Sequence, residues 1–158
     1  MKMEENLLHL CLNKKVTLGA AESCTGGAFS YRLTLIPNIS KCFLGSVIAY
    51  SNKVKHQILQ VPEDLLEREG AVSEAVAIAM LEGALRTLSC DLAIATTGVA
   101  GPTPGENAEI PLGTIYVATG GKHWATQCTR LDLKGTRSQI IQLAVDYTIQ
   151  ALLDRLKS

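Results

Sequence analysis

One short segment, AAESCTGGAF at residues 20–29, concentrates side chains that could do chemistry. Between an apolar run and a pattern typical of a helix it places polar residues and glycines, among them Ser23, Thr25, Gly26 and Gly27. A serine that follows a strand is exposed at the strand's end, and glycines at a helix start leave backbone N–H groups open to a phosphate or a developing oxyanion. Ser23 is therefore a candidate nucleophile. The alternative is an ordinary polar turn in which Ser23 or Thr25 caps the helix.

A serine hydroxyl is a weak nucleophile that needs a base, and the segment AYSNKVKHQ at residues 49–57 offers one. Tyr50 ends a predicted strand and Lys55 follows on the next helix, so both side chains could face one pocket. Burial disfavours the charged form of a lysine, and a lysine with a lowered pKa serves as the base in Ser-Lys hydrolases. Tyr50 could relay a proton or donate one to the leaving group. The alternative is a pair of surface lysines, Lys53 and Lys55. Because neighbouring helical residues point in different directions, His56 is placed outside the site.

A glycine- and proline-rich segment, residues 96–114, follows another buried strand. Loops after the strands of α/β sheets are where ligands bind. Its first residues are therefore candidates for backbone contacts with a ligand: Thr97, Gly98, Ala100 and Gly101. The segment matches neither GxGxxG nor GxxxxGKS/T, so neither a dinucleotide-binding fold nor an ATPase is indicated.

The five cysteines are odd in number, widely spaced and without a CxxC pair, which is typical of reduced thiols in a cytoplasmic protein. Four of them lie in apolar stretches that predict core positions. Cys24 is a rival nucleophile beside Ser23, but a thiolate needs an activating cation or histidine. Neither adjoins it in the sequence, so we expect Cys24 to be buried under the loop. The three histidines show no HxH or HExxH spacing, and no metal site is predicted.

Charge and composition argue against several partners. Fifteen basic residues balance fifteen acidic ones and are scattered along the chain, whereas nucleic-acid binding normally needs a basic surplus. No apolar run approaches the roughly 20 residues that span a bilayer, and the N-terminal residues do not resemble a signal peptide. We expect a cytoplasmic protein with no nucleic-acid or membrane partner. We also expect a homo-oligomer, as is common for small α/β hydrolases.

The elements that must position these clusters are helices and apolar strands mixed along one chain. Helices are expected near residues 3–14, 26–36, 51–61, 62–70, 74–89 and 136–156. Strands are expected near 15–20, 42–50, 91–101 (running into a loop), 113–121 and 124–133, the last two as a hairpin. Such mixing implies a sheet covered on both faces, and the late hairpin makes the sheet mixed. We predict a single α/β domain over residues 1–158, a three-layer α/β/α domain with a mixed β-sheet.

Four motifs, in order, resemble those of one family: AESCTGG, GSVIAYSNKVKHQIL, GAVSEAVA and TTGVAGPTPG…IPLGTIYVA. They are similar to motifs of the CinA C-terminal domain family, to which nicotinamide-nucleotide amidases belong. The resemblance implies hydrolysis of the carboxamide of nicotinamide mononucleotide, a small-molecule nucleotide substrate, to nicotinate mononucleotide and ammonia. No metal or organic cofactor is implied. The implied catalytic residues are a serine nucleophile, Ser23, with Tyr50 and Lys55; which of these two is the base stays open.

The same resemblance implies how the substrate is held. Backbone N–H groups near Thr25, Gly26 and Gly27 would stabilise the oxyanion. The phosphate and ribose of the nucleotide would lie against the loop at residues 98–101. Arg137 stands in a GTR sequence where the family has GDR, and it is a candidate contact for the phosphate.

The expected binding loop departs from the family's pattern, whereas the catalytic motifs are intact. The family's GPxGG and KPVG appear as GPTPG and IPLG, so Pro104 stiffens the loop and Ile110 replaces a usual lysine. Three functions stay open: an active amidase, a related hydrolase with a shifted substrate, and a nucleotide-binding module with little catalysis. The N-terminal domain of two-domain relatives, associated with ADP-ribose pyrophosphatase activity, has no counterpart in this sequence. That activity is not expected here.

Overall fold

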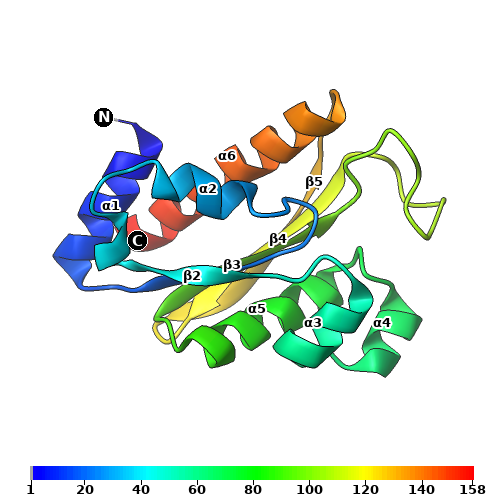
Figure 1. Ribbon diagram of the computed structural model, residues 1–158, viewed down its shortest axis with the longest axis horizontal. Helices are drawn as coiled ribbons and strands as arrows, with labels where there is room; N and C mark the ends of the chain where they lie inside the picture. The colour runs from blue at the N-terminus through cyan, green and yellow to red at the C-terminus, as the bar shows by residue number, and fades with distance from the viewer. Residues whose placement is uncertain (1) are drawn as a thin grey trace.

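Five strands form one mixed sheet at the centre of the computed structural model, which describes residues 2–158 (Figure 1). The strands span Leu18–Glu22 (β1), Phe43–Ile48 (β2), Leu92–Gly98 (β3), Thr114–Gly121 (β4) and Trp124–Asp132 (β5). Their order in the sheet is β2-β1-β3-β4-β5. β1 pairs in parallel with β2 and β3, whereas β4 runs antiparallel to both of its neighbours and forms the expected hairpin with β5.

Helices cover both faces of the sheet, which confirms the predicted α/β fold with a mixed sheet (Figure 1). One face carries Met3–Lys14 (α1), Ala28–Thr34 (α2) and Arg137–Lys157 (α6). The other face carries Asn52–Leu59 (α3), Glu63–Glu69 (α4) and Glu74–Leu88 (α5), and a short 3₁₀ helix spans Ile39–Lys41. Among residues 2–158, none of these helices combines the length and the apolarity that crossing a membrane requires.

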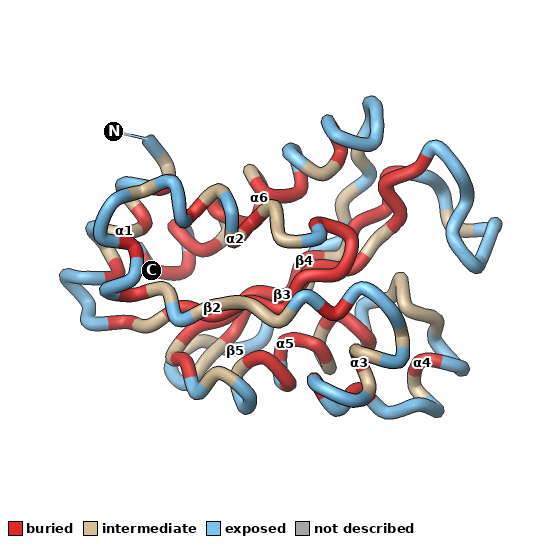
Figure 2. Tube along the Cα trace, in the orientation of Figure 1, coloured by how far each residue is buried: buried red, intermediate tan, exposed pale blue. Residues whose placement is uncertain are grey.

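Alternation along the central strands divides the core between the two helical layers. Leu92 and Ile94 of β3 pack with α1, α2 and α6, whereas Ala93 and Ala95 pack against α3, α4 and α5. Successive side chains of a strand point to opposite faces, so a strand buried on both faces is apolar throughout. Figure 2 shows this buried centre and the exposed loop that follows β3.

A close approach of α3 to α5 fixes the position of α3 on this second face. A Cβ atom on Gly83 of α5 would lie 2.3 Å from the carbonyl oxygen of Leu59 at the end of α3. Arg86 of α5 donates to the same carbonyl oxygen at 3.0 Å. Because a larger residue at position 83 would push the two helices apart, the glycine allows α3 to lie close to α5.

Several element boundaries differ from the sequence-based expectation for local backbone reasons. The second helix begins at Ala28 rather than at residue 26, because Gly26 and Gly27 adopt left-handed φ angles of 56° and 102°. The first strand begins at Leu18 rather than at residue 15, because Lys15 takes a left-handed conformation that ends α1. All five cysteines are free, and Cys11, Cys42 and Cys90 are buried, as expected. Cys128 was also expected in the core but is only partly buried, because β5 is an edge strand of the sheet.

Candidate active site

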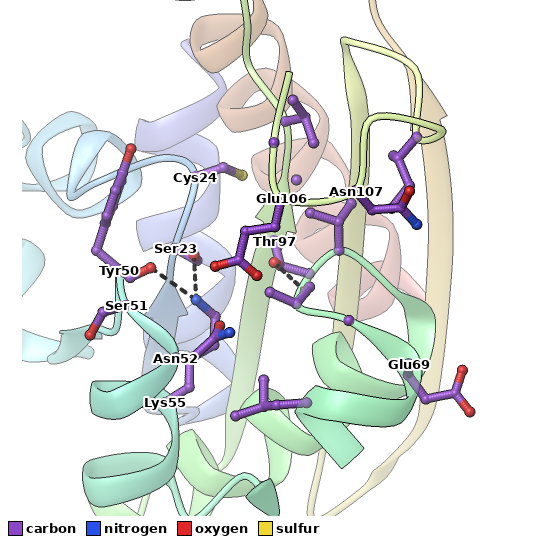
Figure 3. Close-up of a pocket in the computed structure, with 18 of the residues that line it drawn as sticks. Ser23, Cys24, Tyr50, Ser51, Asn52, Lys55, Glu69, Thr97, Glu106 and Asn107 are labelled. Carbon is purple, nitrogen blue, oxygen red and sulfur yellow. Dashed lines mark hydrogen bonds between the residues drawn. The ribbon is translucent and has the colours of Figure 1, made fainter. Parts of the chain in front are cut away.

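A cleft of about 950 Å³ opens at the carboxyl ends of β1 and β3. Its walls come from the segments after β1, β2 and β3, from the connection between α4 and α5, and from the start of α6. Ligands of α/β sheets bind beyond the carboxyl ends of the strands. The segments that the sequence singles out therefore meet in one place (Figure 3).

Ser23 is the first residue after β1 and lines the cleft. Its backbone N–H donates to the Thr96 carbonyl oxygen at 3.1 Å, and its own carbonyl oxygen accepts from the Gly26 N–H at 3.0 Å. The backbone of Ser23 is thus held on one side by β3 and on the other by the turn before α2. Its hydroxyl has a fixed position at the cleft wall.

Lys55 of α3 is buried, with 1% of its surface exposed. Its Nζ donates to the Ser23 Oγ at 2.9 Å and to the Tyr50 carbonyl oxygen at 3.0 Å (Figure 3). Among residues 2–158 it forms no ion pair with a carboxylate. Burial lowers the pKa of Lys55 below 10.5, and smaller opposite effects come from Cys24 and Glu106. Lys55 therefore gives up its proton more readily than a solvated lysine and can exchange it with Ser23.

Tyr50 approaches Lys55 with its backbone, while its phenol ring lies elsewhere. The ring points away from Lys55 (Figure 3), and the hydroxyl accepts a hydrogen bond from Arg137 Nη2 at 3.0 Å. Arg137 Nη1 donates to the Gly101 carbonyl oxygen at 2.7 Å. Arg137 thus connects the phenol of Tyr50 to the loop after β3, and all three residues line the cleft.

Glu22, the last residue of β1, engages the start of α2. Its fully buried carboxylate accepts six hydrogen bonds. The donors are the N–H groups of Gly27, Phe29 and Ser30 and the hydroxyls of Thr25, Ser30 and Ser46. A carboxylate at a helix N-terminus satisfies amides that have no partner within the helix. The sequence shows an acid before this helix, but its role was not predicted.

This arrangement bears on Thr25, Gly26 and Gly27, the expected oxyanion-binding residues. None of the three is among the residues that line the cleft. The Gly27 N–H donates to Glu22 at 3.2 Å, and the Gly26 N–H donates within the turn. Among residues 2–158, no oxygen accepts from the backbone N–H groups of Cys24 and Thr25. Both amides directly follow Ser23 in the chain; Cys24 lines the cleft, whereas Thr25 is buried beside it.

The end of β3 and the loop after it line the opposite side of the cleft with Thr97, Gly98, Ala100 and Gly101. The Thr97 hydroxyl donates to the Ala71 carbonyl oxygen at 2.7 Å and ties the end of β3 to the segment before α5. A Cβ atom on Gly98 would lie 2.6 Å from a carbonyl oxygen of β4, so this glycine serves close packing.

Four further residues border the cleft. Pro104 and Ile110, the positions that depart from the family's pattern, both line it. Cys24 is buried as expected, and burial raises the pKa of its thiol to about 12, which disfavours a thiolate nucleophile. His56 borders the cleft although it was expected outside the site. Its ring contacts the Val61 carbonyl oxygen at 2.8 Å and the Glu63 carboxylate at 3.3 Å.

Glu106 is a cleft residue that sequence reasoning missed. Its side chain projects from the loop after β3 toward Ser23 and Lys55 (Figure 3). No pattern in the sequence distinguishes it from other charged loop residues. Within residues 2–158, no group of three or more His, Cys, Asp or Glu side chains is arranged to hold a metal ion.

Comparison with known proteins gives a consistent result. A family model described as the CinA C-terminal domain matches residues 1–156. A CinA-like protein of Synechococcus sp. (strain RCC307) is 53% identical over 109 residues, which cover 69% of this chain and 26% of that protein. A CinA-like protein of Desulfotalea psychrophila is 41% identical over 143 residues, which cover 89% of this chain and 34% of that protein. The chain therefore spans about a third of the length of such relatives.

Solved structures share the fold. The crystal structure of the competence damage-inducible protein A (ComA) from Klebsiella pneumoniae has a TM-score of 0.94 and 30% sequence identity, with 98% of this chain and 95% of that chain covered. The structure of CihA from Agrobacterium tumefaciens has a TM-score of 0.90 and 29% identity, with 99% and 96% covered. Because the family model matches almost every residue and these structures have the same fold, the chain belongs to the CinA C-terminal domain family.

Proposed function

We propose that this chain is an amidase that hydrolyses the carboxamide of nicotinamide mononucleotide, with Ser23 as nucleophile and Lys55 as base. The observation that carries the proposal is the contact of 2.9 Å between Lys55 Nζ and Ser23 Oγ at the cleft wall. Burying a lysine without a carboxylate partner costs folding free energy. A role of Lys55 in activating Ser23 explains why a lysine is present there. The choice of nicotinamide mononucleotide as the substrate rests on the resemblance of the sequence motifs to those of the family.

The proposed reaction is an acyl transfer in two steps. Neutral Lys55 takes the proton of the Ser23 hydroxyl as Oγ attacks the amide carbon, and a tetrahedral oxyanion forms. The C–N bond then breaks, and the leaving nitrogen takes the proton from the Lys55 ammonium and departs as ammonia. Water attacks the resulting ester, with Lys55 again as the base, and releases the carboxylate product and free Ser23. The sequence of steps uses no metal or organic cofactor.

The remaining groups of the cleft have proposed supporting roles. The N–H groups of Cys24 and Thr25 would donate to the oxyanion, and one such donor is typically worth about 3 kcal/mol in the transition state. The Tyr50 carbonyl oxygen orients Lys55, so we assign the role of base to Lys55 rather than to the phenol of Tyr50. Arg137 would bind the phosphate, because it is a cation at the cleft with guanidinium geometry suited to phosphate oxygens.

The experiment measures ammonia release from nicotinamide mononucleotide by the purified protein and by Ser23→Ala. We expect the substitution to lower kcat by at least about a thousandfold. Ser40→Ala, at an exposed position of the 3₁₀ helix, is the control and should keep full activity. Undiminished activity of Ser23→Ala would refute the nucleophile. A wild-type protein that releases no ammonia, but whose melting temperature rises with the nucleotide, would instead support a binding module.

A further inference from the structure

Glu106 carries a carboxylate that the reaction steps above do not use. It lies on the exposed loop between β3 and β4, and its side chain reaches into the cleft beside Ser23 and Lys55 (Figure 3). Glu69, which also lines the cleft, points away from Ser23 in the same view. Glu63 and Glu67 line the cleft as well, and the Glu63 carboxylate contacts His56. Of these acids, Glu106 is the one whose charge acts on the pKa of Lys55, so it is the carboxylate that we expect a group bound at Ser23 to meet.

This carboxylate has no partner of its own. Among residues 2–158, it forms no ion pair and accepts no hydrogen bond. The negative charge of Glu106 acts on Lys55: it raises the pKa of the lysine, whereas burial lowers that pKa. A negative charge that makes the base harder to deprotonate is unfavourable for activating Ser23, so its position calls for another explanation.

We propose that Glu106 is a specificity-determining residue that orients a carboxamide bound at Ser23 and selects one on a cationic ring. The inference rests on the proposed amidase function. A carboxylate only accepts hydrogen bonds, so it can accept one from the NH₂ group of the substrate. It repels the carbonyl oxygen, which gains negative charge in the transition state. The carbonyl oxygen is therefore turned away from Glu106, and the N–H groups of Cys24 and Thr25 are its proposed donors.

The charge of Glu106 also distinguishes substrate from product. A pyridinium ring is positively charged, so the carboxylate attracts the substrate ring. Hydrolysis replaces the amide by a carboxylate at the position closest to Glu106, and two like charges there repel each other. The same side chain therefore favours binding of the cationic carboxamide and weakens binding of the acid that it becomes.

The test compares Glu106→Gln with wild-type protein on two substrates. One is nicotinamide mononucleotide. The other is its 1,4-dihydropyridine form, which carries the same carboxamide on an uncharged ring. Glutamine keeps the size of the side chain, removes the charge and replaces one carboxylate oxygen by an NH₂ group, while one oxygen remains to accept a hydrogen bond. The measured quantity is kcat/KM for nicotinamide mononucleotide divided by kcat/KM for the dihydropyridine form. An effect of the substitution on the basicity of Lys55 changes both values alike and leaves this ratio unchanged. We expect Glu106→Gln to lower the ratio about tenfold and to lower the inhibition constant of nicotinate mononucleotide about tenfold.

Glu109→Gln is the matched control, because Glu109 is an exposed acid of the same loop that does not line the cleft. It should leave both quantities unchanged. An unchanged ratio in Glu106→Gln, with an active wild type, would overturn the role of Glu106 and leave the amidase proposal intact. Loss of activity on both substrates to the level of Ser23→Ala would also overturn it, because Glu106 would then act in the chemistry.

A wild-type protein that hydrolyses neither nucleotide would refute the proposed function instead. The inference is then tested by binding alone, from the melting temperature with each nucleotide. Preference for nicotinamide mononucleotide over nicotinate mononucleotide that disappears in Glu106→Gln would support it. Equal binding of the two nucleotides by wild type would overturn it.

Discussion

Glu22→Gln is expected to lower the free energy of unfolding by about 3 kcal/mol, because the buried carboxylate holds three segments together. Each carboxylate oxygen accepts three of the six hydrogen bonds, from α2, from the turn before it and from β2. In glutamine one oxygen becomes an NH₂ group. The hydroxyls can rotate and accept from it, but a backbone N–H cannot, so at least one buried amide loses its acceptor.

The magnitude follows from the terms that change. A buried donor left without a partner costs about 1–3 kcal/mol, and hydrogen bonds to the remaining neutral oxygen are each about 1 kcal/mol weaker than those to a charged one. The favourable interaction of the charge with the helix N-terminus, about 0.3–1 kcal/mol, is also lost. Relief from burying a charge offsets part of this sum. A net loss of about 3 kcal/mol corresponds to a melting temperature lowered by about 10 °C for a chain of this size.

Thermal and urea unfolding of Glu22→Gln at neutral pH would measure this loss. The control is Glu82→Gln, at an exposed position of α5 without an ion pair among residues 2–158, which should stay within about 0.5 kcal/mol of wild type. A Glu22→Gln protein as stable as this control would refute the reasoning, since the carboxylate would then contribute no more than a neutral amide.

Three further substitutions probe the cleft. The kcat/KM of wild type should rise with pH through one ionisation below 10.5, because catalysis needs neutral Lys55 and burial lowers the pKa of Lys55. Lys55→Met should abolish the activity and with it this pH dependence. A kcat/KM of wild type that does not change with pH would contradict the assignment of Lys55 as base. Gly98→Ala should destabilise the protein by about 2 kcal/mol in thermal unfolding, because its Cβ would lie 2.4 Å from Ile115 Cδ1. Gly105→Ala, which meets nothing closer than 3.3 Å, is its control. Arg137→Gln should raise the KM for the nucleotide about tenfold with little change in kcat, and the opposite pattern would place Arg137 in the chemistry.

The fold could be predicted because its signals are local. Short apolar strands, helices with recognisable starts and a late hairpin suffice for a mixed sheet covered on both faces. In the structure the hydroxyls of Ser51 and Ser73 cap α3 and α5 by accepting from backbone N–H groups three residues further on, and serine is a residue type typical of such positions. Boundaries were less accurate where a single residue takes a left-handed conformation, as Lys15 and Gly27 do. Sequence alone gives no such angle for a lysine, since non-glycine residues rarely adopt it.

The meeting of Ser23 and Lys55 was within reach of sequence reasoning because both follow parallel strands that are neighbours in the sheet. Any residue just after β1 and any residue on the helix after β2 lie at the same edge. The orientation of the Tyr50 phenol was not within reach. It depends on Arg137, which is 87 residues further along the chain and donates to the phenol from the first turn of α6.

Glu106 differs from these residues in the kind of structure that places it. Ser23 and Lys55 are held by the sheet and by a helix packed on it, whereas Glu106 stands on a loop whose base is closed by two backbone hydrogen bonds between Val99 and residues 113–114, at 2.7 and 2.9 Å. Exposed loop residues carry no periodic pattern that indicates where a side chain points. It follows that the loop can change its length or its charges without moving the nucleophile or the base. If Glu106 selects the substrate, the preference of this site for a charged or an uncharged ring is therefore set separately from its capacity to cleave an amide.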